Sequence, residues 1–384
     1  MSETEISAIL RGAKVYEPFP MSKLNHVNRP TTLITDNVQR TDSRNNAFAN
    51  AHRGDYSKAV AREAPHAATK DPLGNSLADI RRFVASNVPN EIYLTPAPIS
   101  HDPGILTRHI KRLGYFLSAD IMAVSHVPDY AIYSHDMQGN PIDLIYKYAI
   151  VIVMAKEYET LTASSGTDWI GLSLSYDLYL RLAVLAETLA NYIRRLGYPA
   201  SAEYTGKMGG NRVMFAPLLL WSGIGEISRA GLTLNPFLGM GYKAAVVLTD
   251  IPLTPDNPID FSLQDFCRNC KICADLCPGN AIPHDEKTMH NGYETWKLNE
   301  QRCHSFRVLN KKGTYCGRCI RVCPWTRPMT WLHNMVRWAV QRSGIARKIA
   351  IQASRAMKPE KVRLDDKWWF DLDESEGEIK SLEF

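Results

Sequence analysis

The most constraining feature of this 384-residue chain is the placement of its eight cysteines, which all lie between Cys267 and Cys323. The first run, from Cys267 to Pro278, has the spacing Cys-x2-Cys-x2-Cys-x3-Cys-Pro, and a second run ends at Pro324. Thiolates at this spacing are ligands of iron–sulfur clusters. A zinc site built from paired Cys-x2-Cys knuckles leaves the third cysteine unexplained, and disulfides need an oxidising compartment that nothing here indicates. The pattern therefore predicts two [4Fe–4S] clusters and a protein that moves electrons.

The ligands of each cluster follow from a crossing rule. In two-cluster ferredoxins of bacteria, the fourth cysteine of such a run binds the other cluster. The rule assigns Cys267, Cys270, Cys273 and Cys323 to one cluster. It assigns Cys303, Cys316, Cys319 and Cys277 to the other. Eight thiolates then fill two four-ligand sites with none left over.

Composition says less about function than the cysteines do. The chain is 45% apolar and 22% charged, with a net charge of +5. This mild basicity suits an acidic redox partner or a negatively charged cofactor tail, and it does not by itself indicate nucleic acid. No apolar run approaches the roughly 18–20 residues of a membrane span, and the N-terminus lacks the apolar segment of a signal peptide. We therefore expect a cytoplasmic protein with no transmembrane segment and no nucleic-acid partner.

Hydrophobic patterning divides the chain into four parts. The run at 145–155 is typical of a strand buried on both faces, and 244–248 predicts another. Residues 178–196 have helical periodicity that ends at Gly197. Strands alternating with helices indicate an α/β core. The predicted parts are an irregular arm over 1–100, the core over 101–260, a ferredoxin-like domain over 261–328, and a basic helix with an acidic tail over 329–384.

Four further motifs surround the cysteines, and in their order they resemble the corrinoid-dependent reductive dehalogenases. The related epoxyqueuosine reductases share the cobalamin core and the double-cluster module, but they lack the Gly-x3-Trp spacer that ends at Trp296. The resemblance covers about residues 105–335 and extends weakly to the segment from Arg40 to Phe48. The motifs are Gly223-Ile-Gly-Glu-Ile-Ser-Arg-Ala-Gly231, Val247-Leu-Thr-Asp-Ile-Pro-Leu253, Gly292-Tyr-Glu-Thr-Trp296 and Pro324-Trp-Thr-Arg-Pro328.

The resemblance implies a fold and a set of cofactors. The fold would be a mixed α+β and α/β, nitroreductase-like, cobalamin-binding core followed by the ferredoxin-like domain. The cobalamin would be base-off, which agrees with the absence of an Asp-x-His-x2-Gly motif from the sequence. Electrons would pass from the clusters to cobalt, and Co(I) cobalamin would remove halide from a small organohalide. A separate low-potential donor, which is a ferredoxin, a flavodoxin or a reductase, would supply them.

The resemblance also implies two catalytic groups. A tyrosine on the helix before the Leu-Gly-Tyr turn donates a proton, and this role falls to Tyr179 or, as the alternative, Tyr176. A cation just ahead of the Thr-Asp-x-Pro-Leu strand corresponds to Lys243, whose charge would lower the tyrosine pKa. Ser175 lies one helical turn from Tyr179 on the same face. The competing interpretations are a core aromatic residue and a solvated lysine.

Cobalamin contacts are expected at five positions. For the glycines among them, the competing interpretation is that they only allow the backbone to turn. Close backbone approach would suit a corrinoid or its phosphate tail. The five positions are Gly223, Gly225, Arg229, Gly231 and Thr249.

A helix predicted over 329–357 carries Trp331, Met335 and Trp338 on one stripe and basic residues elsewhere. This stripe either packs on the ferredoxin-like domain or docks on a membrane or an acidic donor. Two other functions stay open at this point. One is an epoxyqueuosine-reductase-like enzyme acting on tRNA, which would use an acidic proton donor in place of tyrosine. The other is a non-catalytic electron-transfer protein. The sequence does not name the organohalide or the oligomeric state.

Overall fold

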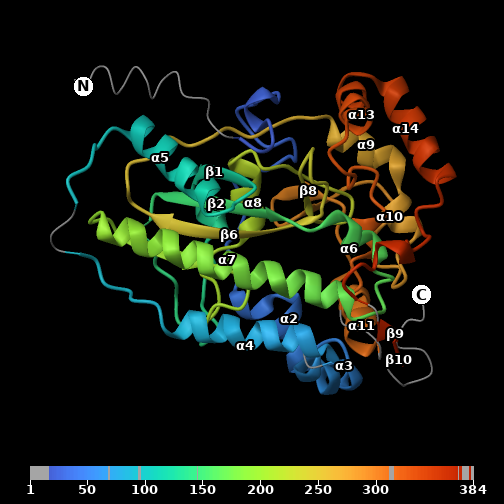
Figure 1. The fold of residues 1–384 in the computed structure, drawn as a ribbon, viewed down its shortest axis with the longest axis horizontal. Coiled ribbons are helices and arrows are strands. Elements are labelled where there is room, and N and C mark those ends of the chain that lie inside the picture. The colour runs from blue at the N-terminus through green and yellow to red at the C-terminus, as the bar shows by residue number, and fades with distance from the viewer. Residues whose placement is uncertain are drawn as a thin grey trace.

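The computed structural model describes residues 17–67, 70–93, 97–144, 146–310, 315–370, 372–373 and 380–381. A four-stranded sheet forms the centre of the molecule (Figure 1). Its strands are β1 (Ile121–His126), β2 (Tyr148–Ala155), β3 (Ala200–Glu203) and β6 (Tyr242–Thr249). They lie in the order β1-β2-β6-β3, and every neighbouring pair is antiparallel.

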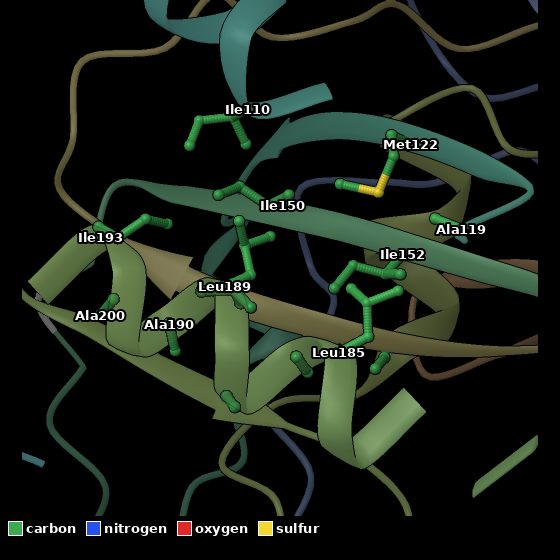
Figure 2. Close-up of a cluster of buried hydrophobic side chains, with 14 of the residues drawn as sticks. Ile110, Ala119, Met122, Ile150, Ile152, Leu185, Leu189, Ala190, Ile193 and Ala200 are labelled. Carbon is green, nitrogen blue, oxygen red and sulfur yellow. The ribbon is translucent and has the colours of Figure 1, made fainter. Parts of the chain in front are cut away.

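Alternation along the strands sends successive side chains to opposite faces of this sheet. On one face, Ile150 and Ile152 pack against α5 (Pro103–Phe116) and α7 (Ile170–Arg195), as Figure 2 shows for Ile110, Leu185 and Leu189. On the other face, β2 and its neighbours pack against α8 (Phe215–Trp221). The buried run predicted at 145–155 therefore has its physical reason, because β2 is covered on both sides.

The predicted arm contains more helix than its sequence suggests. Helices α2 (Ala47–Arg53) and α3 (Lys58–Glu63) pack against α11 (Glu300–Leu309) through a small apolar cluster. Helix α4 (Pro72–Ser86) begins at the capping residue Asp71 and runs along α7 (Figure 1). Helices α2 and α3 have only seven and six residues, so little periodicity marks them in the sequence. Residues 1–16 of the arm lie outside the described part of the chain.

The cysteine-rich part follows the core. Helix α9 (Leu263–Cys270) and helix α10 (Ile272–Asp275) carry the first run, and α12 (Arg318–Arg321) lies within the second. Trp296, Trp325 and Phe266 pack with Cys267 and Cys323 in one buried cluster. Smaller elements are α6 (Tyr158–Ala163), β4 (Glu226–Ile227) with β5 (Thr233–Leu234), β7 (Thr288–His290) with β8 (Tyr293–Thr295), and β9 (Leu372–Asp373) with β10 (Lys380–Ser381).

The single helix predicted over 329–357 is wrong, because the structure has two helices there. These are α13 (Trp331–Arg342) and α14 (Gly344–Ala356). Ser343 between them is extended, with φ −133° and ψ 124°, and its side chain caps α14 at the backbone N–H of Ala346. The segment packs on the ferredoxin-like domain, as one of the two alternatives predicts, but not through the tryptophan stripe, since Trp331 is 76% exposed and Trp338 is 59% exposed. Val340 and Ile351 form the buried contact instead.

Within the described residues, no helix is both long enough and apolar enough to span a bilayer. Most of the predicted acidic tail lies outside those residues.

Candidate active site beside the second set of cysteines

The thiols influence one another's pKa in a largely crossed pattern, although Cys319 also acts on Cys273 and Cys323 also acts on Cys319. Cys323 raises the pKa of Cys267, Cys270 and Cys273, after burial as the largest cause. Cys277, at the end of the first run, instead acts on thiols of the second group. We call Cys267, Cys270, Cys273 and Cys323 the first set. We call Cys277, Cys303, Cys316 and Cys319 the second set.

All eight cysteines are free thiols. Loss of solvent raises the pKa of seven of them and so favours the neutral form. Burial raises the pKa of Cys270 to about 12. Among the described residues, no three His, Cys, Asp or Glu side chains converge closely enough for a single metal ion. Thiolates around a cubane are spread over four irons rather than one. The two groups are therefore suited to clusters, which also compensate the charge of buried thiolates.

Tyr179 lies on α7 with its hydroxyl held by two partners from distant parts of the chain. Lys243 Nζ donates to Tyr179 Oη at 2.8 Å, and Tyr315 Oη lies 3.0 Å from the same oxygen. The sheet register brings Lys243 here, because it pairs with Met154 near the end of β2. Lys243 Nζ also lies 4.7 Å from the centre of the Tyr179 ring and 5.4 Å from that of Tyr315.

Arg307 on α11 completes this group, and no local sequence pattern predicts it. Its guanidinium lies 4.3 Å from the centre of the Tyr315 ring. Its charge also acts to lower the pKa of Cys303, so the group adjoins the second set of cysteines. Burial opposes the charge of Arg307, but Tyr315 and Cys303 outweigh it and raise the arginine pKa. We call Tyr179, Lys243, Arg307 and Tyr315 the tyrosine–cation cluster.

The two phenols of this cluster titrate as a pair because they share a hydrogen bond. Burial raises the pKa of Tyr179 well above its usual range, and Tyr315 adds to the rise. Burial also acts to raise the pKa of Tyr315, but Lys243 and Arg307 outweigh it and the pKa is lowered. The sequence analysis expected Lys243 to lower the pKa of Tyr179, whereas the structure shows the pKa of Tyr315 lowered instead. Burial lowers the pKa of Lys243.

Three members of the tyrosine–cation cluster, Tyr179, Arg307 and Tyr315, line a cavity of about 740 Å³. Tyr176 lines the same cavity, with Arg81 5.3 Å from its ring centre. No hydrogen bond of the Tyr176 hydroxyl is found within the described part of the chain, in contrast to Tyr179. The lining also includes Phe48, Tyr133, His304 and the turn from Thr205 to Gly210. No carboxylate is among the described residues of the lining.

Several buried polar atoms around this cavity have no hydrogen-bond partner among the described residues. They include Ser43 Oγ, Arg81 Nε and Asn211 Oδ1. A buried polar group without a partner is costly, so such atoms mark places where a ligand can supply one. Arg81 and Arg307 are cations that the sequence analysis did not assign to the site. Their helices show amphipathic patterns only, and nothing local distinguishes them from surface arginines.

The five residues predicted to contact cobalamin are not brought together at this cavity. Arg229 is 1% exposed and donates to backbone carbonyls of Cys267, Arg268, Pro283 and Asp285, which tie the first run to its following loop. Thr249 Oγ1 donates to Pro199 O. Gly223 and Gly225 face backbone atoms of Asn257 and Leu234, where a Cβ would not fit. Gly231 lines a second cavity. For these five residues, a corrinoid contact stays a prediction.

The predicted α/β core is wrong in one respect, because the central sheet is antiparallel and the core is therefore of the α+β type. Fold and site together define a class of protein, namely one that carries an iron–sulfur dicluster domain after an α+β core. Residues 266–326 match the family model of the 4Fe-4S dicluster domain.

Similarity to particular proteins extends beyond that domain. Tetrachloroethene reductive dehalogenase of Dehalobacter restrictus is 34% identical over 206 residues, which cover 51% of this chain and 36% of that protein. The enzyme of the same name from Sulfurospirillum multivorans is 34% identical over 172 residues, or 43% of this chain and 33% of the other. Epoxyqueuosine reductase of Staphylococcus aureus is 34% identical over 119 residues, only 28% of each chain.

A solved structure shows the same relationship over nearly the whole chain. The catabolic reductive dehalogenase NpRdhA matches with a TM-score of 0.88 and 34% identity, covering 94% of this chain and 53% of that one. This chain thus spans about half the length of that dehalogenase, and its matched region spans about a third of the curated relatives. The chain is a relative of the reductive dehalogenases, and the resemblance inferred from its motifs is confirmed.

Proposed function

We propose that this chain is the catalytic part of a reductive dehalogenase, which converts an organohalide, two electrons and one proton into the dehalogenated product and a halide ion. The observation that carries the proposal is the buried Tyr179 hydroxyl at the cavity wall, held by Lys243 and adjoining the second set of cysteines. This arrangement places a proton source, a cation and an electron entry point together.

Two [4Fe–4S] clusters fit the cysteines. The crossed ligand assignment is supported by the influence of Cys323 on Cys267 and Cys270. It is also supported by the influence of Cys277 on Cys303 and Cys316. The second set would hold the cluster nearer the cavity, because Arg307 and Tyr315 line the cavity and the charge of Arg307 acts on Cys303.

The cavity is larger than one halogenated ring requires, which leaves room for part of a cobalamin beside the substrate. A second, mostly apolar cavity of about 250 Å³ has Thr41, Tyr130 and Met214 on its wall. These residues lie two or three positions along the chain from Ser43, Tyr133 and Asn211, which line the first cavity. Trp296 Nε1 and Thr32 Oγ1 in the second cavity are buried and lack partners among the described residues. A base-off cobalamin has a detached base and tail that need such a space. We propose that the core is the nitroreductase-like domain that binds it.

Cobalamin, when bound, supplies a cobalt that accepts electrons one at a time and delivers them to the carbon–halogen bond. The protein supplies the rest. Tyr179, whose raised pKa keeps it protonated, donates the proton to the carbon that loses halide. Lys243 holds the tyrosine oxygen in place and offers a positive charge to the negative charge that develops as the bond breaks.

The cavity favours a halogenated aromatic substrate with an anionic group. Arg307 and Arg81 line it without a carboxylate among its described residues, while Phe48, Tyr133 and Tyr176 offer aromatic surface. NpRdhA was solved in complex with 3-bromo-4-hydroxybenzoic acid, a molecule of this kind. The lack of a carboxylate in the described lining also argues against the epoxyqueuosine-reductase-like alternative, for which an acidic donor is expected.

Electrons would come from a separate low-potential donor, and the reducing cytoplasm would suit the free thiols. The exposed face of α13 and α14 is one place where such a donor could bind. The packed side of α14 contacts α9, and Arg355 on α14 donates to the backbone carbonyl of Cys270, which belongs to the first set of cysteines.

The proposal is tested by loading the purified chain anaerobically with iron, sulfide and cobalamin. It is then supplied with a low-potential reductant and 3-bromo-4-hydroxybenzoic acid. Release of one bromide for each 4-hydroxybenzoic acid formed supports the proposal. A chain that takes up both cofactors yet releases no halide from halogenated phenols, benzoates or alkenes contradicts it.

A further inference from the structure

Lys156 is a buried lysine with an unusual environment. It follows β2 directly, and its backbone N–H donates to Gly241 O at 2.8 Å. Its side chain runs inward, so that the residue is only 8% exposed. Nζ donates to Ser175 Oγ at 3.0 Å, and Ser175 Oγ in turn donates to Gly171 O at 3.0 Å. Ser175 therefore anchors the ammonium but brings no charge to it.

No carboxylate compensates this ammonium among the described residues. The charged groups that act on it are Lys243 and Arg307, which oppose its charge, and Cys319, which favours it. Burial and Lys243 lower the pKa of Lys156, so an isolated chain without clusters disfavours the charged form. A buried charge is normally paired. The one negative partner available to Lys156 here belongs to the second set of cysteines.

Close packing ties the surroundings of Lys156 to that set. A Cβ on Gly171, whose carbonyl accepts from Ser175, would lie 2.6 Å from Tyr315 O. A Cβ on Gly166 would lie 2.4 Å from Cys316 O, so both glycines allow the start of α7 to press against the backbone of the second run. Arg318 also donates to Ser165 O at 3.3 Å. The position of the ammonium relative to this set is thus fixed by backbone contacts.

We propose that Lys156 is the buried counter-charge of the second cluster and raises the reduction potential of that cluster relative to the first. This inference rests on the proposed clusters but not on dehalogenation. When the cluster accepts one electron, it gains one negative charge and no bond forms or breaks. A fixed ammonium in a poorly screened interior stabilises that added charge. Lys156 does not line the cavity. Its effect on any reaction there would therefore act through the reduction potential of the second cluster.

The test is a redox titration of the anaerobically loaded chain, followed by EPR. The variants are Lys156→Met, Lys156→Gln and Lys156→Arg. Lys156→Gln keeps an N–H that can donate to Ser175 Oγ but removes the positive charge, while Lys156→Arg keeps the positive charge. The matched control is Lys147→Met, because Lys147 is an exposed lysine at the opposite end of β2. Cys277→Ala, in which only the first cluster is expected, assigns the two reduction steps.

Loss of the charge should disfavour reduction of the second cluster at least tenfold in both neutral variants. For a one-electron couple this is a downward shift of about 59 mV. The first cluster should move less, and Lys156→Arg and Lys147→Met should stay near the unchanged chain. An unchanged potential in Lys156→Gln with both clusters present overturns the proposal. Equal shifts of both clusters, or a shift in Lys156→Arg as large as in Lys156→Met, also overturn it. Halide release is not part of this readout, so its absence bears only on the proposed function.

Discussion

Replacing Tyr179 by Phe removes one oxygen from the centre of the tyrosine–cation cluster and keeps the ring. That oxygen accepts from Lys243 at 2.8 Å and lies 3.0 Å from Tyr315 Oη. A general acid contributes about 10²–10⁴-fold to the rate, which corresponds to about 3–5 kcal/mol of activation free energy. We therefore expect turnover to fall by that factor. Leaving Lys243 without its acceptor should cost only about 1–3 kcal/mol of folding free energy.

Lys243→Met should lower turnover to a similar extent, because the ammonium positions the Tyr179 hydroxyl. The two changes act on one hydrogen bond, so the double variant should be little worse than either single variant. The assay is halide release under anaerobic conditions, with iron and cobalamin measured in each preparation. Tyr176→Phe is the matched control from the same helix, since no described hydrogen bond involves its hydroxyl. It should keep turnover close to that of the unchanged chain.

Two results would refute this reasoning. A Tyr179→Phe chain with normal turnover would show that the proton comes from elsewhere, and a loss in Tyr176→Phe would point to that residue. A double variant whose loss equals the product of the single losses would show that Tyr179 and Lys243 act independently.

Three further changes test other parts of the structure. Cys277→Ala should reduce the iron content from about eight to about four per chain by removing the second cluster, and loss of the first cluster's EPR signal instead would contradict the crossed ligands. Burial lowers the pKa of Lys243, so its ammonium, and with it turnover, should be lost as pH rises through a value below 10.5; Lys243→Arg should move this alkaline decline upward in a pH–rate profile. Gly239→Ala should lower the free energy of unfolding in urea by about 1–3 kcal/mol or more, because φ is +58° and a Cβ would lie 2.3 Å from Thr326 Oγ1. Gly209→Ala, at φ +78° in open space, should cost less, and equal losses would be evidence against the clash.

Much of the fold was predictable because apolar periodicity reports burial directly. The strand at 145–155 and the long helix ending before Gly197 both appear where the patterns place them. Cysteine spacing likewise specifies its chemistry locally. The break between α13 and α14 was missed because helical periodicity continues across Ser343, although Ser343 followed by Gly344 is a recognisable start of a helix.

The candidate site was predictable only in part. Tyr179 and Lys243 were identified by resemblance, but their contact depends on the register of β2 with β6, which no local pattern encodes. Arg307 and Tyr315 reach the site from beyond the first run of cysteines. Arg229 shows the converse difficulty. A buried arginine beside glycines suggests a ligand site, whereas its donors are used by backbone carbonyls of the dicluster domain.

The central claim is that this chain uses electrons from its clusters to exchange a halogen for a proton at the Tyr179 wall of the cavity. Single-turnover reaction of the fully loaded, pre-reduced chain with 3-bromo-4-hydroxybenzoic acid tests it most directly. The account predicts one bromide and one 4-hydroxybenzoic acid per two electrons lost from the chain, with the rate reduced in Tyr179→Phe at equal cofactor content. Oxidation of the chain without bromide release, or equal rates in both chains, would contradict it.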